Sequence, residues 1–251
     1  MSHTPIINLK SPYVGLSRNI LQLDMVFDGE TPEYFNDFAT HSYMGLEAIT
    51  YLDVISHTPE FIEINSMPRI LKKDCEKISF NVFERMIIAG FDSVKRREDS
   101  ELFKIINDTM NRDNGISVAG LLQPDNLILG ITLLEQKNIL ADKILVSPHR
   151  YKDIRLWTCD KIPELNLSSK EELKKRAYGG NYMGCDIFVS PMLPKNAIYI
   201  IAEAEIMGYL SIKYDICAMD VNKEFELGVD ITETVGFCVT NPDSIVRVQV
   251  H

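Results

Sequence analysis

Two pairs of carboxylates near the C-terminal end have the spacing that acid–base chemistry uses. Glu203 and Glu205 alternate in the stretch AEAEIMGY, and alternate residues of a strand lie on the same face. Two carboxyl groups on one face can transfer a proton, as in a small hydrolase. Asp230 and Glu233, in GVDITETVG, form the second pair. For the first pair we favour the alternative of a solvated strand edge or a salt bridge between subunits.

A histidine and two arginines form a second candidate for chemistry. His149 follows a proline in SPHRYKD, at a predicted helix start, with Arg150 and Arg155 close behind it. Backbone N–H groups at a helix start, together with cationic side chains, can bind an anion. This pattern would suit a dimeric binding protein with a ligand pocket at these residues. The alternative, which we favour, is a histidine that only caps the helix at the surface.

The common catalytic and metal-binding motifs are missing from the sequence. It contains no G-x-S-x-G, no G-x-x-x-x-G-K-[ST], no H-E-x-x-H and no G-x-G-x-x-G. Zinc sites need ligands in local pairs, and the histidines and cysteines show no such pairing. The cysteines are predicted to be reduced thiols packed as small apolar side chains: Cys75, Cys159, Cys185, Cys217 and Cys238. The sequence therefore predicts no catalytic residue, no cofactor and no metal.

The charge of the chain limits its partners. The 26 Lys and Arg residues are outnumbered by 36 Asp and Glu residues, for a net charge of -10. Tight coating of nucleic acid needs clustered cations, so this balance argues against it, although it is compatible with enclosing nucleic acid. The run KRRED at 95–99 is predicted to be a solvated helix face with pairs such as Lys95 with Asp99. No run of about 20 apolar residues is present, which predicts neither a signal peptide nor a membrane span.

The first 60 residues are predicted to be two extended pieces rather than a core. Residues 1–30 are an arm whose apolar stretches are interrupted by proline and glycine, so it must pack on something else. Residues 31–60 are a long hairpin, with strands at 33–38 and 48–55 and a tip at 39–46. An apolar tip of this kind usually contacts a partner, although it can also fold back on its own domain. The predicted subunit-interface residues are Tyr34, Phe35, Phe38, His41, Tyr43, Met44 and Leu46.

The remaining chain predicts a mixture of helices and strands. A strand-like stretch at 61–80 precedes an apolar repeat of three and four residues, which predicts one helix at 82–110, about 40 Å long. A second helix begins at Pro124, and a strand around 144–146 ends at Ser147-Pro148 before a short helix. The stretches CDIFVS and AIYIIAEA read as strands of the same mixed unit, and nearly everything after Gly208 reads as strand. The expected fold class is α+β.

This order of parts resembles the major capsid proteins of tailed bacteriophages, which have the Hong Kong 97-like fold. Four stretches carry the resemblance and cover most of residues 80–250: KRREDSELFKIIND, KILVSPHRYKDIRLW, GCDIFVSPMLPKNAIYIIAEAEIMGYLSIKYDI and ITETVGFCVTNPDSIVRV. Encapsulins, which are bacterial nanocompartments, share this fold.

The resemblance implies a domain organisation. It places an N-terminal arm at 1–30, an extended hairpin loop at 31–60, a peripheral domain with the long spine helix at 61–119, an axial domain at 120–212 and closing peripheral strands at 213–251. The last strands would fill one sheet on the spine helix, joined by the turn Asn241-Pro242-Asp243. The residues expected to fill this sheet are Phe237, Val239, Ile245, Val246 and Val248.

The resemblance also implies a function. Subunits would assemble as pentamers and hexamers into an icosahedral shell that encloses double-stranded DNA without sequence-specific binding. Scaffolding, portal or decoration proteins would be partners, the location would be the virion capsid, and assembly would take place in the host cytoplasm. An encapsulin-type shell is the alternative. Encapsulins usually start with a helix that lines the interior and receives cargo, so the proline-rich extended start here favours the phage capsid.

Overall fold

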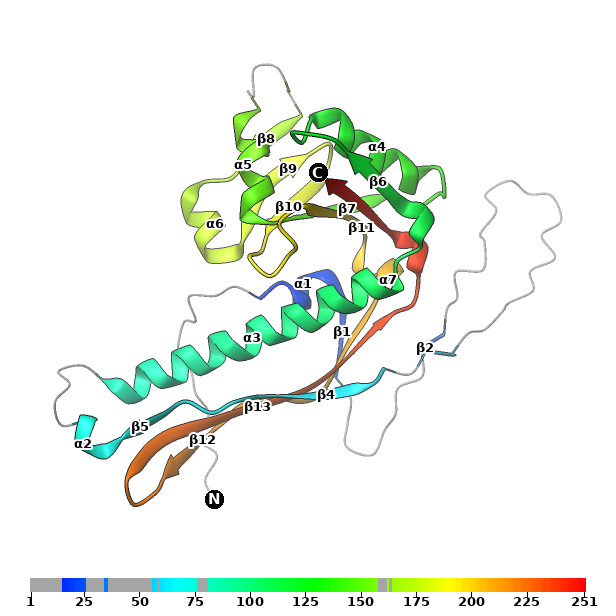
Figure 1. Cartoon of the computed structure of the whole chain (residues 1–251). Helices are drawn as coiled ribbons and strands as arrows, with labels where there is room; N and C mark the ends of the chain where they lie inside the picture. The colour runs from blue at the N-terminus through cyan, green and yellow to red at the C-terminus, as the bar shows by residue number, and fades with distance from the viewer. Residues whose placement is uncertain are drawn as a thin grey trace.

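The structure is a computed structural model that describes residues 15–25, 34–35, 56–57, 59–75, 81–157, 162 and 164–251. It is mixed helix and sheet, as expected for the α+β class (Figure 1). A long helix and a long strand pair form an elongated limb, and a second sheet with its own helices forms a rounded unit beside it. One buried apolar cluster fills the limb and continues onto one face of the second sheet, and another lies on the opposite face of that sheet.

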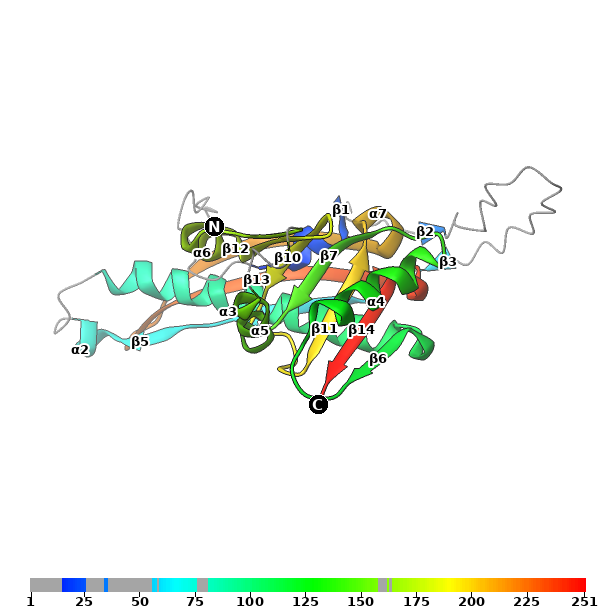
Figure 2. The same cartoon turned by 90° about the horizontal axis from the view of Figure 1, so that it is seen from above.

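The long helix of the limb is α3 (Val82–Thr109), 28 residues that match the predicted helix at 82–110. It begins where the Asn81 side chain accepts a hydrogen bond from the Glu84 N–H at 3.1 Å, an ordinary N-terminal cap. At 1.5 Å per residue it is about 42 Å long. Its buried residues follow the apolar period. The helix runs along the sheet of the limb (Figure 2).

The sheet of the limb is built on two long antiparallel strands. Its strands, in spatial order, are β1 (Gln22–Met25), β12 (Gly208–Asn222), β13 (Glu226–Val239) and β4 (Phe61–Ser66), with β5 (Arg69–Leu71) also pairing with β13. The predicted strand-like stretch 61–80 is therefore two strands, followed by the short helix α2 (Lys72–Cys75). Helix α3 lies so close to β13 that a Cβ on Gly90 would be 2.3 Å from Ile231 Cδ1.

The rounded unit contains a seven-stranded mixed sheet. The order is β6 (Gly115–Val118), β14 (Ile245–Val250), β11 (Ala197–Ala202), β7 (Ala141–Val146), β10 (Cys185–Val189), β9 (Tyr178–Tyr182) and β8 (Leu165–Leu167). Its helices are α4 (Pro124–Glu135), α5 (Pro148–Leu156) and α6 (Lys170–Arg176). The starts of α4 and α5 at prolines are as predicted. Every residue of the central strand β11 is buried, which explains its unbroken apolar sequence.

The expectation that the final strands share one sheet is wrong. Phe237 and Val239 lie in β13 of the limb, whereas β14 is an inner strand of the seven-stranded sheet. The predicted turn is present as the 3-10 helix Pro242–Ser244, where Asn241 accepts a hydrogen bond from the Asp243 N–H at 3.1 Å. The chain changes sheets here, because Val246 and Val248 are apolar partners of α4 rather than of α3.

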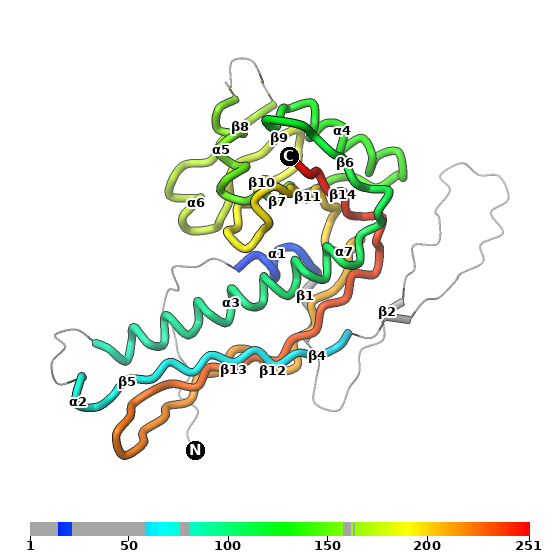
Figure 3. Tube along the Cα trace, viewed as in Figure 1, coloured from blue at the N-terminus to red at the C-terminus, as the bar shows by residue number. Residues whose placement is uncertain are grey.

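The described part of the N-terminal segment packs on its own chain. It forms a short helix, α1 (Ser17–Ile20), that lies against the middle of α3, and then β1 (Figure 3). Leu16, Ile20 and Leu21 are buried in the limb core, so this part of the arm is not wholly extended. The remaining short elements are β2 (Tyr34–Phe35), β3 (Ser56–His57), the 3-10 helix Arg112–Asn114 and α7 (Ala204–Met207).

Candidate functional site

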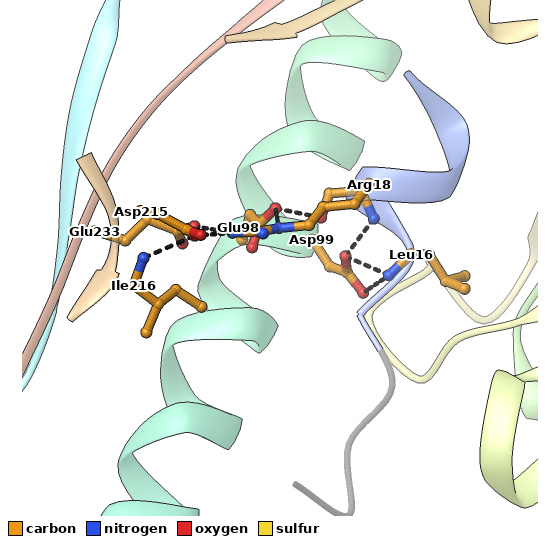
Figure 4. Close-up of polar contacts among 8 residues, drawn as sticks. Leu16, Arg18, Glu98, Asp99, Asp215, Ile216 and Glu233 are labelled. Carbon is orange, nitrogen blue, oxygen red and sulfur yellow. Dashed lines mark hydrogen bonds and ion pairs between the residues drawn. The ribbon is translucent and has the colours of Figure 1, made fainter. Parts of the chain in front are cut away.

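A cluster of charged side chains lies where α1, α3, β12 and β13 meet (Figure 4). At its centre is Arg18 of α1. Its Nη2 lies 2.8 Å from Asp215 Oδ1 and 2.5 Å from Glu233 Oε1, and its Nε lies 3.6 Å from Glu98 Oε1. Glu98 and Glu233 are 1% and 0% exposed, whereas the Arg18 side chain is 35% exposed. Buried ionisable groups in such a cluster are candidates for a functional role.

The local sequence places both buried glutamates on core-facing positions. On β13 the inward positions alternate, and Glu233 takes the middle position of the row Val229, Ile231, Glu233, Val235 and Phe237. On α3 every fourth residue faces inward, and Glu98 interrupts the row Val94, Glu98, Leu102 and Ile106. A carboxylate at a position that otherwise holds apolar side chains is a signal visible in the sequence, but Glu233 was predicted only as a partner of Asp230 and Glu98 only as part of a solvated helix face.

A β-bulge in β12 brings the third carboxylate to the cluster. Tyr214 pairs with Thr234 and Cys217 with Thr232, so two residues of β12 lie opposite the single residue Glu233. Bulges of this kind redirect side chains. Here the extra residue is Asp215, whose Oδ1 also accepts a hydrogen bond from the Ile216 N–H at 2.8 Å.

Adjacent carboxylates of α3 hold the start of α1. Asp99 Oδ1 accepts hydrogen bonds from the backbone N–H groups of Leu16 at 2.8 Å and Ser17 at 2.9 Å. Glu98 Oε1 accepts a hydrogen bond from the Ser17 hydroxyl at 2.6 Å. The predicted solvated face with a Lys95–Asp99 pair is therefore wrong, because α1 covers this side of the helix and buries Asp99.

Burial and mutual repulsion set the pKa values in the cluster. Burial, and then the negative charge of Glu98, raise the pKa of Glu233 to about 8 against the opposing effect of Arg18. Burial likewise raises the pKa of Glu98. For Asp215, burial is the largest single effect and acts in the raising direction, but the hydrogen bonds from Arg18 and the Ile216 N–H, together with the charge of Arg18, lower the pKa. One cation therefore serves three carboxylates, and the two buried ones compete for it.

The structure does not support the acid–base pair Glu203 and Glu205. Strand β11 ends at Ala202, Glu203 caps α7 and Glu205 lies within it, so they are not alternate residues of a strand. Both side chains are exposed. The chain turns at this point because it leaves the fully buried strand for the sheet of the limb.

The second predicted pair is also separated. Asp230 and Glu233 are three residues apart on β13 and lie on opposite faces. Asp230 forms an ion pair with Arg69, while Glu233 faces α3 and Arg18.

The predicted anion site at the start of α5 is not assembled. His149 is exposed, whereas Arg150 is buried and donates hydrogen bonds to Asp153 Oδ2 and Asn196 Oδ1, both at 3.1 Å. Arg155 instead lies 5.9 Å from the centre of the Tyr151 ring. Successive residues of a helix point in different directions, which separates His149 from Arg150. A surface cavity of about 600 Å³ lies elsewhere, between the end of α3 and strands β6 and β14.

Two of the predicted interface residues lie within the described residues and five lie outside them. Tyr34 and Phe35 form β2, which pairs antiparallel with β3. Phe38, His41, Tyr43, Met44 and Leu46 lie outside the described residues. Within the described ranges, no group of three His, Cys, Asp or Glu side chains is arranged to hold a metal ion. No helix in this part of the chain is long and apolar enough to cross a membrane.

Comparison with known proteins identifies the fold. No family model matches the sequence, and no curated protein matches it either. A structure from Microbacterium phage Oxtober96 is similar over 100% of this chain and 96% of its own, with 10% identity and a TM-score of 0.67. The holo-SrpI encapsulin complex of Synechococcus elongatus is similar over 99% of this chain and 91% of its own, with 12% identity and a TM-score of 0.67. The capsid structure of cyanophage P-SCSP1u is similar over 99% of this chain and 92% of its own, with 10% identity and a TM-score of 0.64.

These similarities extend over nearly the whole chain, with TM-scores well above chance. The protein therefore has the Hong Kong 97-like capsid fold that phage capsid structures and encapsulins share. At about 10% identity, this similarity establishes the fold alone.

Proposed function

We propose that this protein is the major capsid protein of a tailed bacteriophage and forms an icosahedral shell around double-stranded DNA. The observation that carries the proposal is the full-length similarity to the cyanophage capsid structure. The net charge of -10 supports it, because the inner wall of a container benefits from not adhering to the DNA it encloses. The working unit is then a pentamer or hexamer of this chain, with no catalytic residue and no cofactor.

The two sheets of the subunit would correspond to the two domains of a capsid protein. The limb would be the peripheral domain and the rounded unit the axial domain, so that β6 and β14 would leave the predicted peripheral ranges 61–119 and 213–251 for the axial domain. Strand β14 pairs with β11 and β6 on either side, which favours assigning it to the axial side. Strands β2 and β3 pair at the base of the predicted hairpin 31–60, and this supports an extended loop that reaches a neighbouring subunit.

The experiment that tests the proposal is a measurement of particle size. Light scattering and electron microscopy of the purified protein should show closed shells or discrete capsomers, because a small hydrolase or a dimeric binding protein would not form them. A homogeneous monomer or dimer under every assembly condition would exclude the shell. Scaffolding, portal and decoration proteins would be sought as partners that alter the yield or size of the particles.

The encapsulin-type shell is the second candidate, because the Synechococcus encapsulin is as similar in fold as the phage structures. The contents of the particles separate the two candidates. A capsid produced during infection contains nuclease-protected DNA, whereas an encapsulin contains protein cargo. Assembly in the host cytoplasm, followed by location in the virion, belongs to the capsid proposal.

A further inference from the structure

One carboxylate oxygen in the cluster, on the buried Glu233, lacks a hydrogen-bond donor among the described residues. Glu233 accepts from Arg18 through Oε1, but its Oε2 is buried and has no hydrogen-bond partner in the described part of the chain. The carboxyl groups of Glu98 and Glu233 are close enough for a hydrogen bond between them. Two ionised carboxylates are both acceptors, so that bond exists only when one of them carries a proton.

We propose that Glu98 and Glu233 form a proton-binding site that holds one shared proton at neutral pH, and that losing this proton loosens the packing of α3 on β13. The site is intramolecular and does not depend on the proposed shell function. Each glutamate belongs to one of the two elements whose contact forms the limb. The proton therefore acts on the contact between the spine helix and the long strand.

Among the described residues, the surroundings supply one positive charge and several negative ones. From α1 come Arg18 and the Ser17 hydroxyl, which donates to Glu98. From α3 comes Asp99, which accepts from the start of α1, and from β12 comes Asp215, which shares Arg18. Strand β4 places the buried, apolar Ile64 opposite Glu233. If both glutamates were ionised, the partly exposed Arg18 would have to balance the second one while it already pairs with Asp215 and the first glutamate.

Loss of the proton therefore has a defined physical consequence. Two negative charges on facing elements repel, and burial prevents water from screening them. Separation of α3 from β13 at this point admits water and relieves the repulsion. Because Val94 and Leu102 flank Glu98 on the helix, the same separation exposes apolar core. The proton is lost over the range in which the Glu233 pKa lies, at about 8.

Infrared spectroscopy of the purified full-length protein tests the proposal directly. A protonated carboxyl group has a carbonyl stretch at higher frequency than an ionised carboxylate. Ordinary Asp and Glu side chains are ionised above about pH 6, so a band remaining at that pH reports a perturbed acid. We expect one such band, which disappears between about pH 7 and about pH 9. Absence of the band in the wild-type protein at about pH 6 would overturn the proposal without any variant.

Matched variants assign the band. Glu233→Gln and Glu98→Gln keep the shape of the side chain and remove one carboxyl, so each should abolish the band. Asp230→Asn removes a carboxyl of the same strand that faces away from the cluster and pairs with Arg69, and it should leave the band in place. Hydrogen exchange of the α3 backbone, corrected for intrinsic rates, should increase with pH in the wild type and not in Glu233→Gln. A band that persists in both glutamine variants, or an increase unaffected by Glu233→Gln, would contradict the assignment.

Discussion

The guanidinium of Arg18 lies 2.5 Å from the carboxylate of Glu233, although 215 residues separate them in the chain. This contact joins the N-terminal segment to the long strand β13, and it passes beside Glu98 of the spine helix (Figure 4). Three elements of the limb are thus held at a single charged point inside an otherwise apolar core. The stability of the limb should accordingly depend on this point more than on any exposed ion pair.

Replacement of Arg18 should destabilise the protein in a pH-dependent way. Arg18→Gln removes the cation from two buried carboxylates, and breaking a buried ion pair costs about 3–5 kcal/mol. Arg18 is partly exposed, so we expect the lower end, about 3 kcal/mol, at about pH 9. At about pH 6 the loss should be smaller, since the shared proton then removes one of the charges. Denaturant unfolding at both pH values measures the difference.

Arg97→Gln is the matched control for that variant. The exposed Arg97 forms an i,i+4 pair with the half-buried Glu101 on the same helix, so its loss should cost about 0.5 kcal/mol at either pH. Equal effects of the two substitutions would show that the buried position of the Arg18 pairs is unimportant.

The wild-type protein should lose stability as the pH rises from about 4.5 to about 8. The folded state holds the Glu233 proton more tightly than the unfolded chain, whose glutamates titrate near 4.5. The contribution of Glu233 to the free energy of unfolding is therefore full below about pH 4.5 and is lost as the pH rises to about 8. Between about pH 6 and about pH 8 we expect a loss of about 2 kcal/mol, or about 4–8 °C in Tm. Differential scanning calorimetry of wild type and Glu233→Gln isolates this contribution. Parallel Tm curves for the two proteins would contradict the raised pKa.

Removal of the Asp99 carboxylate should release the start of α1. Asp99→Ala leaves the N–H groups of Leu16 and Ser17 without their acceptor, at a cost of about 1–3 kcal/mol. Limited proteolysis should cut faster around residues 15–21 in this variant. Asp108→Ala, at an exposed position near the end of the same helix, should leave the cleavage rate unchanged.

Gly90→Ala should destabilise the limb although alanine favours helices. The gain in helix propensity is about 1 kcal/mol, but the new Cβ would lie 2.3 Å from Ile231 Cδ1, and overpacking costs about 1–3 kcal/mol. Ile231→Val removes that Cδ1 atom, so the double variant should be more stable than the sum of the single effects predicts. Strict additivity of the unfolding free energies would show that α3 and β13 are not packed this closely. A Gly90→Pro change should instead break the helix, at about 3 kcal/mol or more.

Deletion of residues 38–46 should separate folding from assembly. The sequence predicts that this hairpin tip contacts a neighbouring subunit, so its loss removes an interface without removing core. We expect a subunit with an unchanged Tm that no longer forms particles in electron micrographs. A Gly/Ser replacement of equal length distinguishes the loss of side chains from a shortened loop. Normal particles from both variants would exclude the tip from the interface.

Local sequence patterns were sufficient for the long elements. The capping residue Asn81 and the apolar repeat behind it set the start and the inward face of α3, and the prolines at 124 and 148 mark the starts of α4 and α5. These features depend on residues within a few turns of one another, so they can be read without knowing the partner. The order of such elements was also enough to indicate the capsid fold.

The tertiary structure alone decided which elements meet. A periodic pattern shows that a face is buried, but not what covers it, so the transfer of β14 to the second sheet and the covering of Asp99 by α1 could not be read from spacing. The sequence indicated Glu233 only as an acid–base candidate beside Asp230. Only the approach of Arg18, Glu98 and the bulge at Asp215 from distant positions turned it into a charged cluster, because the free energy of a buried charge depends on the groups around it in space.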